Sequence, residues 1–146
     1  MIKVQEDDFD LNLEIKNITS HNKNIGGVAS FIGIVRDNEN EKLKSMTLEH
    51  YPIMTEKMLE KINSEAKSRW KLIDSIIIHR FGKLYPGDQI VLVATFSQHR
   101  KDALEACEFL IDWLKTKAPF WKLETTNNGE NWVKEKNSDL KAANKW

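Results

Sequence analysis

Apolar residues in the first half of the chain recur with two spacings, one typical of strands and one of helices. Residues 28–35, VASFIGIV, are rich in β-branched and aromatic side chains and predict a strand. Residues 46–51, MTLEHY, alternate between two faces and predict a second strand, with the polar residues 37–42, DNENEK, as a surface loop between them. From Thr55 to Trp70 apolar positions recur every four residues, which predicts a helix with Thr55 as its N-cap.

The second half of the chain repeats this order and ends in a hairpin. Residues 73–82 predict a strand, residues 85–88, YPGD, a turn, and residues 89–97, QIVLVATFS, a strand buried on both faces. A helix follows, in which Asp102 and Glu105 resemble a capping box, and the proline at position 119 predicts its end near Thr116 or Lys117. Asn128-Gly129 predicts a two-residue hairpin turn, and the tail after Ser138 predicts a short helix.

This order of elements favours an α+β fold with mixed or antiparallel strands. Strands come in adjacent pairs and only two helices are substantial, whereas a doubly wound parallel sheet alternates strand and helix. No internal repeat, low-complexity tract or linker divides the 146 residues, so we expect a single domain over residues 1–146.

Composition narrows the functional classes. Lys plus Arg and Asp plus Glu both number 22, whereas a general nucleic-acid-binding domain usually carries a basic excess. The single cysteine, Cys107, excludes an internal disulfide and a multi-cysteine zinc site, which suits a cytoplasmic protein. The acidic amino terminus is unlike a signal peptide, and no apolar run reaches the about 18 residues of a membrane span. No spacing of histidines and carboxylates predicts a metal site.

Buried roles are favoured for the cysteine and for two of the histidines. Cys107 lies in the middle of a predicted helix among apolar residues, where a structural thiol is favoured over a nucleophile. His50 and His79 fall within predicted strands, where we expect them to satisfy hydrogen bonds in the core.

Basic side chains at the ends of strands and helices are candidates for binding an anion. Ser97 to Arg100, SQHR, join a buried strand to a helix amino terminus, where free N–H groups and the helix dipole favour negative charge. A solvated loop is the alternative. Arg36 ends the first strand, a position that suits either a ligand contact or a solvated side chain. These residues indicate a small anionic ligand and name no reaction.

The stretch KTKAPFWK, residues 115–122, places three lysines around a helix end. Lysines in the last helical turn gain about 0.3–1 kcal/mol from the helix dipole, so Lys115 and Lys117 need no functional role on that ground. Lys122 lies beyond the proline, and helix capping does not explain it.

Five segments together resemble the large, catalytic subunits of molybdopterin synthases. They are FIGIVR (31–36), LEHYPIMTEK (48–57), IHRFGKLYPGD (78–88), SQHR (97–100) and LKTKAPFWKLE (114–124), in the order of that family. The resemblance implies an α/β-hammerhead fold and a sulfurtransferase of molybdenum cofactor biosynthesis, which converts precursor Z, a cyclic pyranopterin monophosphate, into molybdopterin. It implies no bound cofactor, because sulfur arrives as a thiocarboxylate on the C-terminal Gly-Gly of a small ubiquitin-like subunit. It also implies a heterotetramer built around a central homodimer.

The resemblance also assigns roles to residues of this chain. Lys115 and Lys122 match the two essential lysines of the family and are the implied catalytic residues. The implied substrate-binding residues are Ile34, Val35, Arg36, His99, Arg100, Leu123, Glu124 and Lys136. Lys136 falls where the family often has a basic residue that reaches across the dimer. It is a point charge, without the two-pronged geometry of arginine.

Two other functional classes remain as alternatives. A module that docks the ubiquitin-like tail or a phosphorylated metabolite without turnover would not need both lysines together with the basic residues. RNA binding is disfavoured by the zero net charge and by the absence of an RNP motif.

Overall fold

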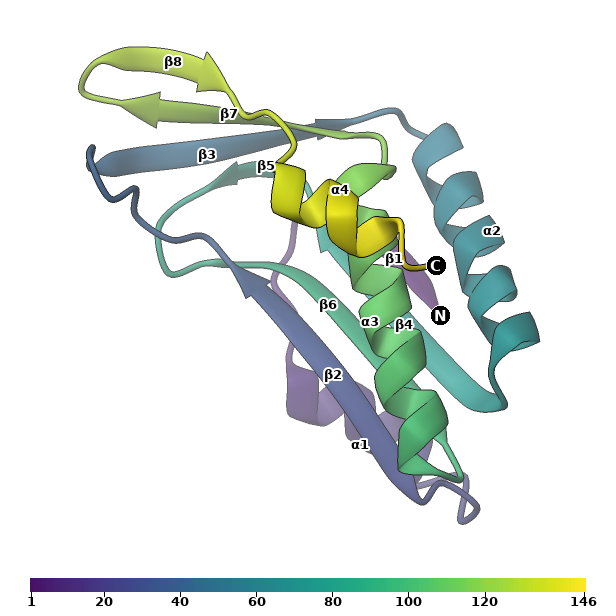
Figure 1. Cartoon of the computed structure of the whole chain (residues 1–146). Helices are drawn as coiled ribbons and strands as arrows, with labels where there is room; N and C mark the ends of the chain where they lie inside the picture. Colours follow the sequence, from purple (N-terminus) through teal and green to yellow (C-terminus); the bar gives the residue numbers. More distant parts are fainter.

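The computed structural model describes residues 1–146 as two four-stranded sheets and four helices (Figure 1). In chain order the elements are β1 (Ile2–Gln5), α1 (Leu11–Thr19), β2 (Gly27–Ile34), β3 (Leu43–His50), α2 (Met54–Arg69), β4 (Leu72–Arg80), β5 (Gly82–Leu84), β6 (Gln89–Ser97), α3 (Arg100–Thr116), β7 (Phe120–Thr126), β8 (Gly129–Trp132) and α4 (Asn137–Ala143). The predicted α+β class is confirmed.

The first sheet has the strand order β1-β4-β6-β2, in which only the β1–β4 pair is parallel. Alternation along β4 sends Ile76 and Ile78 toward α1, and Ile77 toward α2 and α3. Each face of the sheet therefore has its own apolar layer. The central strand β6 is buried from Ile90 to Ser97, which confirms the predicted burial on both faces.

The second sheet has the order β5-β3-β7-β8 and is antiparallel throughout. It lies across the end of the first sheet at which α3 finishes (Figure 1). The predicted turn at residues 85–88 is present, with Gly87 at a φ of 96°. The hairpin turn lies at residues 127–128, one residue before the predicted Asn128-Gly129, and Gly129, at a φ of 112°, begins β8. The second sheet thereby brings β7 back beside the last turn of α3.

The two predicted helix caps are wrong. Helix α2 begins at Met54, and Thr55 is a buried helical residue whose hydroxyl donates to the Tyr51 carbonyl (2.6 Å). Helix α3 begins at Arg100 with His99 as its N-cap, and no side chain caps it. The predicted end of α3 is confirmed, because its last helical residue is Thr116.

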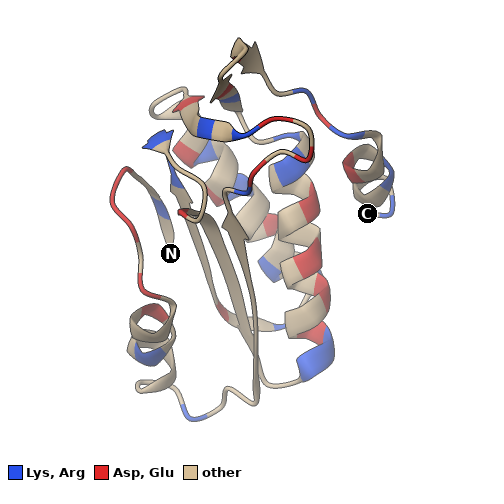
Figure 2. Cartoon of the chain, turned by 90° about the vertical axis from the view of Figure 1, so that its left-hand side faces the viewer, with Lys and Arg blue, Asp and Glu red and all other residues tan.

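Charged residues are frequent on the helices and loops, whereas the strands of the first sheet carry few of them (Figure 2). No helix combines the length and the apolar character needed to cross a membrane. No group of three or more His, Cys, Asp or Glu residues is placed to hold a metal ion. The feature that stands out is a cavity between the two sheets and the C-terminal segment.

Candidate active site

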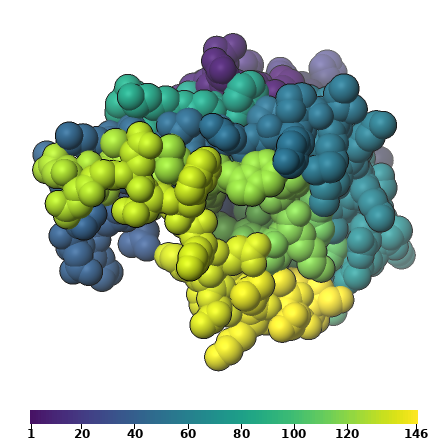
Figure 3. Space-filling model, turned by 90° about the horizontal axis from the view of Figure 1, so that it is seen from above, coloured from purple at the N-terminus to yellow at the C-terminus, as the bar shows by residue number.

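A cavity of about 180 Å³ opens where the end of α3, the start of β7 and the C-terminal segment meet. Viewed from above, the yellow C-terminal segment crosses beside the green residues of α3 and β7 (Figure 3). Strands of the first sheet supply the floor. The lining residues are Gly33, Ile34, His79, Ile90, Val91, Ile111, Leu114, Lys115, Ala118, Phe120, Lys122, Val133, Lys134, Glu135, Lys136 and Asp139.

The break after α3 brings two of the three clustered lysines together. The Lys117 N–H donates to the Trp113 carbonyl (2.8 Å) at the helix end, and β7 starts at Phe120 after the proline. Lys115 reaches the cavity from the last helical turn and Lys122 from the returning strand. Lys117 instead lines a separate hollow between α2, α3 and α4. Helix capping therefore remains a sufficient explanation for Lys117 alone.

Lys122 is the cavity lysine whose proton affinity is strongly changed. Burial, followed by the positive charge of Lys115, lowers the pKa of Lys122 from 10.5 to about 8. Asp139 and Glu124 oppose this change, and Lys136 adds to it. A lysine with such a pKa exchanges its proton near physiological pH, which suits it to general acid–base catalysis.

The C-terminal segment forms one wall of the cavity and is held in place at several points. The Val133 N–H donates to the Lys122 carbonyl (2.8 Å), and the Lys136 carbonyl accepts the first backbone hydrogen bonds of α4. Beyond α4, Trp146 Nε1 donates to Asp112 Oδ2 on α3 (2.6 Å), and its ring packs edge-on against Phe109. Lys136 thus joins the cavity from a segment that is anchored on α3.

The structure separates the remaining residues that were predicted for the site. Ile34 lines the cavity, but Val35 is buried in the core with 2% of its surface exposed, and Arg36 is exposed. Leu123 and Glu124 follow Lys122 on β7 without lining the cavity. Glu124 Oε2 accepts a hydrogen bond from Asn38 Nδ2 (3.1 Å) and so ties the loop after Arg36 to β7.

His99 and Arg100 lie at the other end of α3. The 17 residues of this helix span about 25 Å at 1.5 Å per residue, so a single chain does not bring these two side chains to the lysines. Both are exposed, and His99 lines a different hollow together with Asn24 and Lys71.

Sequence reasoning missed His79 as a component of the site. His79 was expected in the core, and it is buried there, but the same ring also lines the cavity. The expected burial of Cys107 is confirmed, and burial raises the pKa of its thiol to about 11. Strand periodicity identifies a buried position but does not show that a cavity lies next to it.

Comparison with known proteins identifies close relatives of the chain. Residues 4–117 match the sequence model of the MoaE protein family. The molybdopterin synthase catalytic subunit of Ralstonia nicotianae is 53% identical over 146 residues, covering 99% of this chain and 83% of the relative. The solved structure of the molybdopterin biosynthesis MoaE protein from Burkholderia ambifaria is 53% identical, with a TM-score of 0.86 over 100% of this chain and 97% of that one.

A second solved structure shows a relative in complex with another protein. It is the protein–protein complex of subunits 1 and 2 of the molybdopterin-converting factor from Helicobacter pylori. Its matching chain is 26% identical, with a TM-score of 0.77, and the match covers 92% of this chain and 91% of that one.

Proposed function

The chain belongs to the MoaE protein family of molybdopterin synthase catalytic subunits, and on that premise we propose that it installs two sulfur atoms on precursor Z. The sulfur comes from the thiocarboxylate at the C-terminal Gly-Gly of a small ubiquitin-like subunit. The observation that carries the proposal is the cavity in which Lys115 and Lys122 meet, because it places a lysine that can donate and a lysine whose lowered pKa lets it accept a proton around one reaction centre.

Each lysine has a distinct part in the proposed reaction. The thiocarboxylate sulfur forms a bond to a pterin carbon while a C–O bond at that carbon breaks, and the oxygen leaves as water or as a phosphate oxygen. A water molecule then attacks the acyl carbon of the tail. The acyl C–S bond breaks, which leaves sulfur on the pterin and a carboxylate on the tail. Lys115 stabilises the tetrahedral oxyanion. Lys122, whose pKa is about 8, takes the proton of the attacking water.

The state of the cysteine supports an external source of sulfur. A persulfide carrier needs an exposed thiol that ionises readily, whereas Cys107 is buried and its pKa is raised to about 11. Its sulfur faces the Val93 carbonyl at 4.0 Å in the core. This supports the proposal that a second protein delivers the sulfur.

An apolar edge next to the cavity supports docking of that second protein. Strand β2 pairs only with β6, which leaves its other edge free. Three of its large apolar side chains are exposed, Val28 (38%), Phe31 (38%) and Ile34 (54%), and Ile34 also lines the cavity. We propose that the ubiquitin-like subunit binds here and extends its tail toward the lysines.

The distant basic residues support a role for a second copy of the chain. His99 and Arg100 belong to the implied substrate-binding set, yet about 25 Å of helix separates them from the lysines. A central homodimer accounts for both facts, because each copy then supplies His99 and Arg100 to the cavity of the other. This arrangement gives the phosphate of the substrate an arginine as well as lysines.

Reconstitution tests the proposed function. Wild-type protein is mixed with thiocarboxylated small subunit and precursor Z, and dithiolene formation is measured. Lys115→Ala and Lys122→Ala are expected to lose at least about a hundredfold in rate. Lys117→Ala is the matched control and is expected to keep the wild-type rate. Product formation by Lys115→Ala at the wild-type rate would refute the role of Lys115, and tail binding without product would establish a docking module instead.

A further inference from the structure

His79 is a nearly buried histidine on the floor of the lysine cavity. Only 5% of its surface is exposed, and it lies near the end of β4 opposite Val91 of β6. Its ring stacks on Phe120, with 3.6 Å between ring centroids and 13° between ring planes. Both rings line the cavity. The position of the imidazole is therefore set by packing as well as by hydrogen bonding.

One ring nitrogen of His79 forms a hydrogen bond with the backbone. Nδ1 lies 2.8 Å from the Arg80 carbonyl, and a carbonyl only accepts, so Nδ1 carries the proton. The neutral ring then presents a lone pair at Nε2. Burial, together with the charges of Lys122 and Lys115, lowers the pKa of His79 to about 3, so the ring is neutral at physiological pH.

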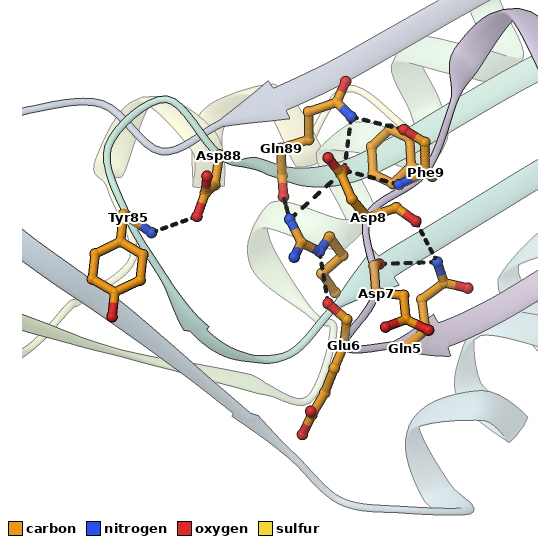
Figure 4. Close-up of polar contacts among 9 residues, drawn as sticks. Gln5, Glu6, Asp7, Asp8, Phe9, Tyr85, Asp88 and Gln89 are labelled. Carbon is orange, nitrogen blue, oxygen red and sulfur yellow. Dashed lines mark hydrogen bonds and ion pairs between the residues drawn. The ribbon is translucent and has the colours of Figure 1, made fainter.

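The residue that accepts this hydrogen bond is itself held firmly. Arg80 donates to the Glu6 carbonyl and to the Gln89 carbonyl, both at 2.9 Å. Gln89 Nε2 in turn donates to Asp8 Oδ1 (2.8 Å) and to the Phe9 carbonyl (2.9 Å), as the dashed lines in Figure 4 show. These contacts tie the segment before α1 to the ends of β4 and β6, and they hold the carbonyl that orients the imidazole.

The other ring nitrogen opens on the cavity. Every fully buried side-chain nitrogen or oxygen has a hydrogen-bond partner, whereas His79 Nε2 has none among the protein atoms. Nε2 is therefore accessible, and the space next to this ring is the cavity that it lines. A nearly buried acceptor of this kind requires a donor from outside the chain.

His79 Nε2 is a neutral hydrogen-bond acceptor, and in this it differs from the charged side chains that line the same cavity. The cavity lysines, Lys115, Lys122, Lys134 and Lys136, are donors when charged, and they suit the anionic groups of a ligand. The two lining carboxylates, Glu135 and Asp139, belong to the C-terminal wall and carry charge. His79 is the neutral acceptor that the sheet contributes to the floor.

We propose that His79 Nε2 accepts a hydrogen bond from an N–H group of the molecule bound in the cavity, and that it thereby orients that molecule toward the lysines. This inference rests on the proposed function, which supplies two sources of such a donor. One is a backbone amide of the Gly-Gly tail, and the other is a ring or amino N–H of the pterin.

Two substitutions separate the two nitrogens of the ring. In His79→Asn the side-chain amide replaces the Nδ1–H donor but offers nothing at the position of Nε2. In His79→Gln the longer amide places its oxygen near Nε2 and gives up the bond to Arg80. Binding of the small subunit and of precursor Z is measured separately by calorimetry, and the melting temperature Tm is recorded for each variant.

We expect the two substitutions to have opposite effects on ligand affinity and on Tm. His79→Asn keeps the bond to Arg80 and so has a higher Tm than His79→Gln, but it binds one of the two ligands about tenfold more weakly, the effect of one lost hydrogen bond. His79→Gln has a lower Tm and binds that ligand within about twofold of the wild type. The ligand that is affected identifies the source of the donor. His50→Asn is the matched control, because His50 also packs on Phe120 (5.9 Å between centroids) without lining the cavity.

Other results would overturn the inference. Wild-type affinity of His79→Asn for both ligands excludes a contact at Nε2, and equal weakening in both variants indicates a purely structural role. The ¹⁵N chemical shift of His79 Nε2 in the wild-type protein gives a test without substitution, because it moves when the lone pair accepts a hydrogen bond and stays constant otherwise. Wild-type protein that binds neither ligand refutes the proposed function as well, whereas a failure of the His79 tests alone leaves that function standing.

Discussion

Replacing Lys122 by methionine is expected to make the fold more stable at neutral pH while abolishing product formation. Methionine has a similar length and no charge, so it fills the same space beside Phe120 without a buried ammonium group. The repulsion between the positive charges of Lys122 and Lys115 is then also removed. Lys122 thus illustrates a residue that function requires and that stability disfavours.

The size of the effect follows from the pKa of Lys122, which falls from 10.5 to about 8 on folding. At about 1.4 kcal/mol per pKa unit, this change disfavours the charged lysine in the folded state by about 3 kcal/mol. Access of solvent at the cavity mouth reduces that figure, and we expect a gain in unfolding free energy of about 1–2 kcal/mol for Lys122→Met.

The gain in unfolding free energy of Lys122→Met should depend on pH in a defined direction. Because the pKa is lower in the folded state, the unfolded chain holds more protons between about pH 8 and pH 10.5, and wild-type stability rises with pH across that window. Below about pH 8 the penalty is present in full, so the difference between Lys122→Met and wild type is largest there and shrinks toward about pH 10.

Urea unfolding followed by tryptophan fluorescence measures this difference at about pH 6.5, 8 and 9.5. Lys117→Met is the matched control, since Lys117 is exposed at the helix end and its loss removes about 0.3–1 kcal/mol of favourable dipole interaction. A Lys122→Met variant less stable than the wild type at about pH 6.5, or a gain that is constant across the range, would refute the reasoning.

Three further predictions concern other parts of the chain. Ile53 is a β-branched residue at φ 69° with 69% of its surface exposed, so Ile53→Gly should raise the unfolding free energy by about 1 kcal/mol, while Ile53→Val leaves it unchanged; a loss in urea unfolding would contradict this. Cys107→Ala should keep the rate of dithiolene formation within about twofold, because its buried thiol does not carry the sulfur that is transferred; an inactive, folded variant would disprove external delivery. Trp146→Ala removes the bond to Asp112, so amide hydrogen exchange should accelerate in α4 and not in β6, and equal protection in α4 would argue against the anchor.

Local patterns in the sequence were sufficient to predict the elements whose signals lie within a few residues. The apolar run of β6, the glycine turns and the proline after α3 each act on the backbone directly, and each was predicted close to its observed place. The starts of the helices were not predicted correctly. For α2, the start is determined by Tyr51 and Ile53 and not by the nearest capping residue. Strand β1 and helix α1 were missed, since β1 is short and its pairing partner, β4, lies about 70 residues away.

The sequence by itself determined the family and the α+β class, and it singled out Lys115, Lys122 and Lys136 among the four lysines that line the cavity. Its motifs also pointed to His99 and Arg100, although these lie at the far end of α3 from the cavity. Only the tertiary structure decided that the pKa of Lys122 is about 8 and that His79 presents an acceptor to the same cavity. The physical reason is that burial and charge–charge interactions depend on distances in space, and here β4, α3, β7 and residues 133–139 meet only when the two sheets pack together.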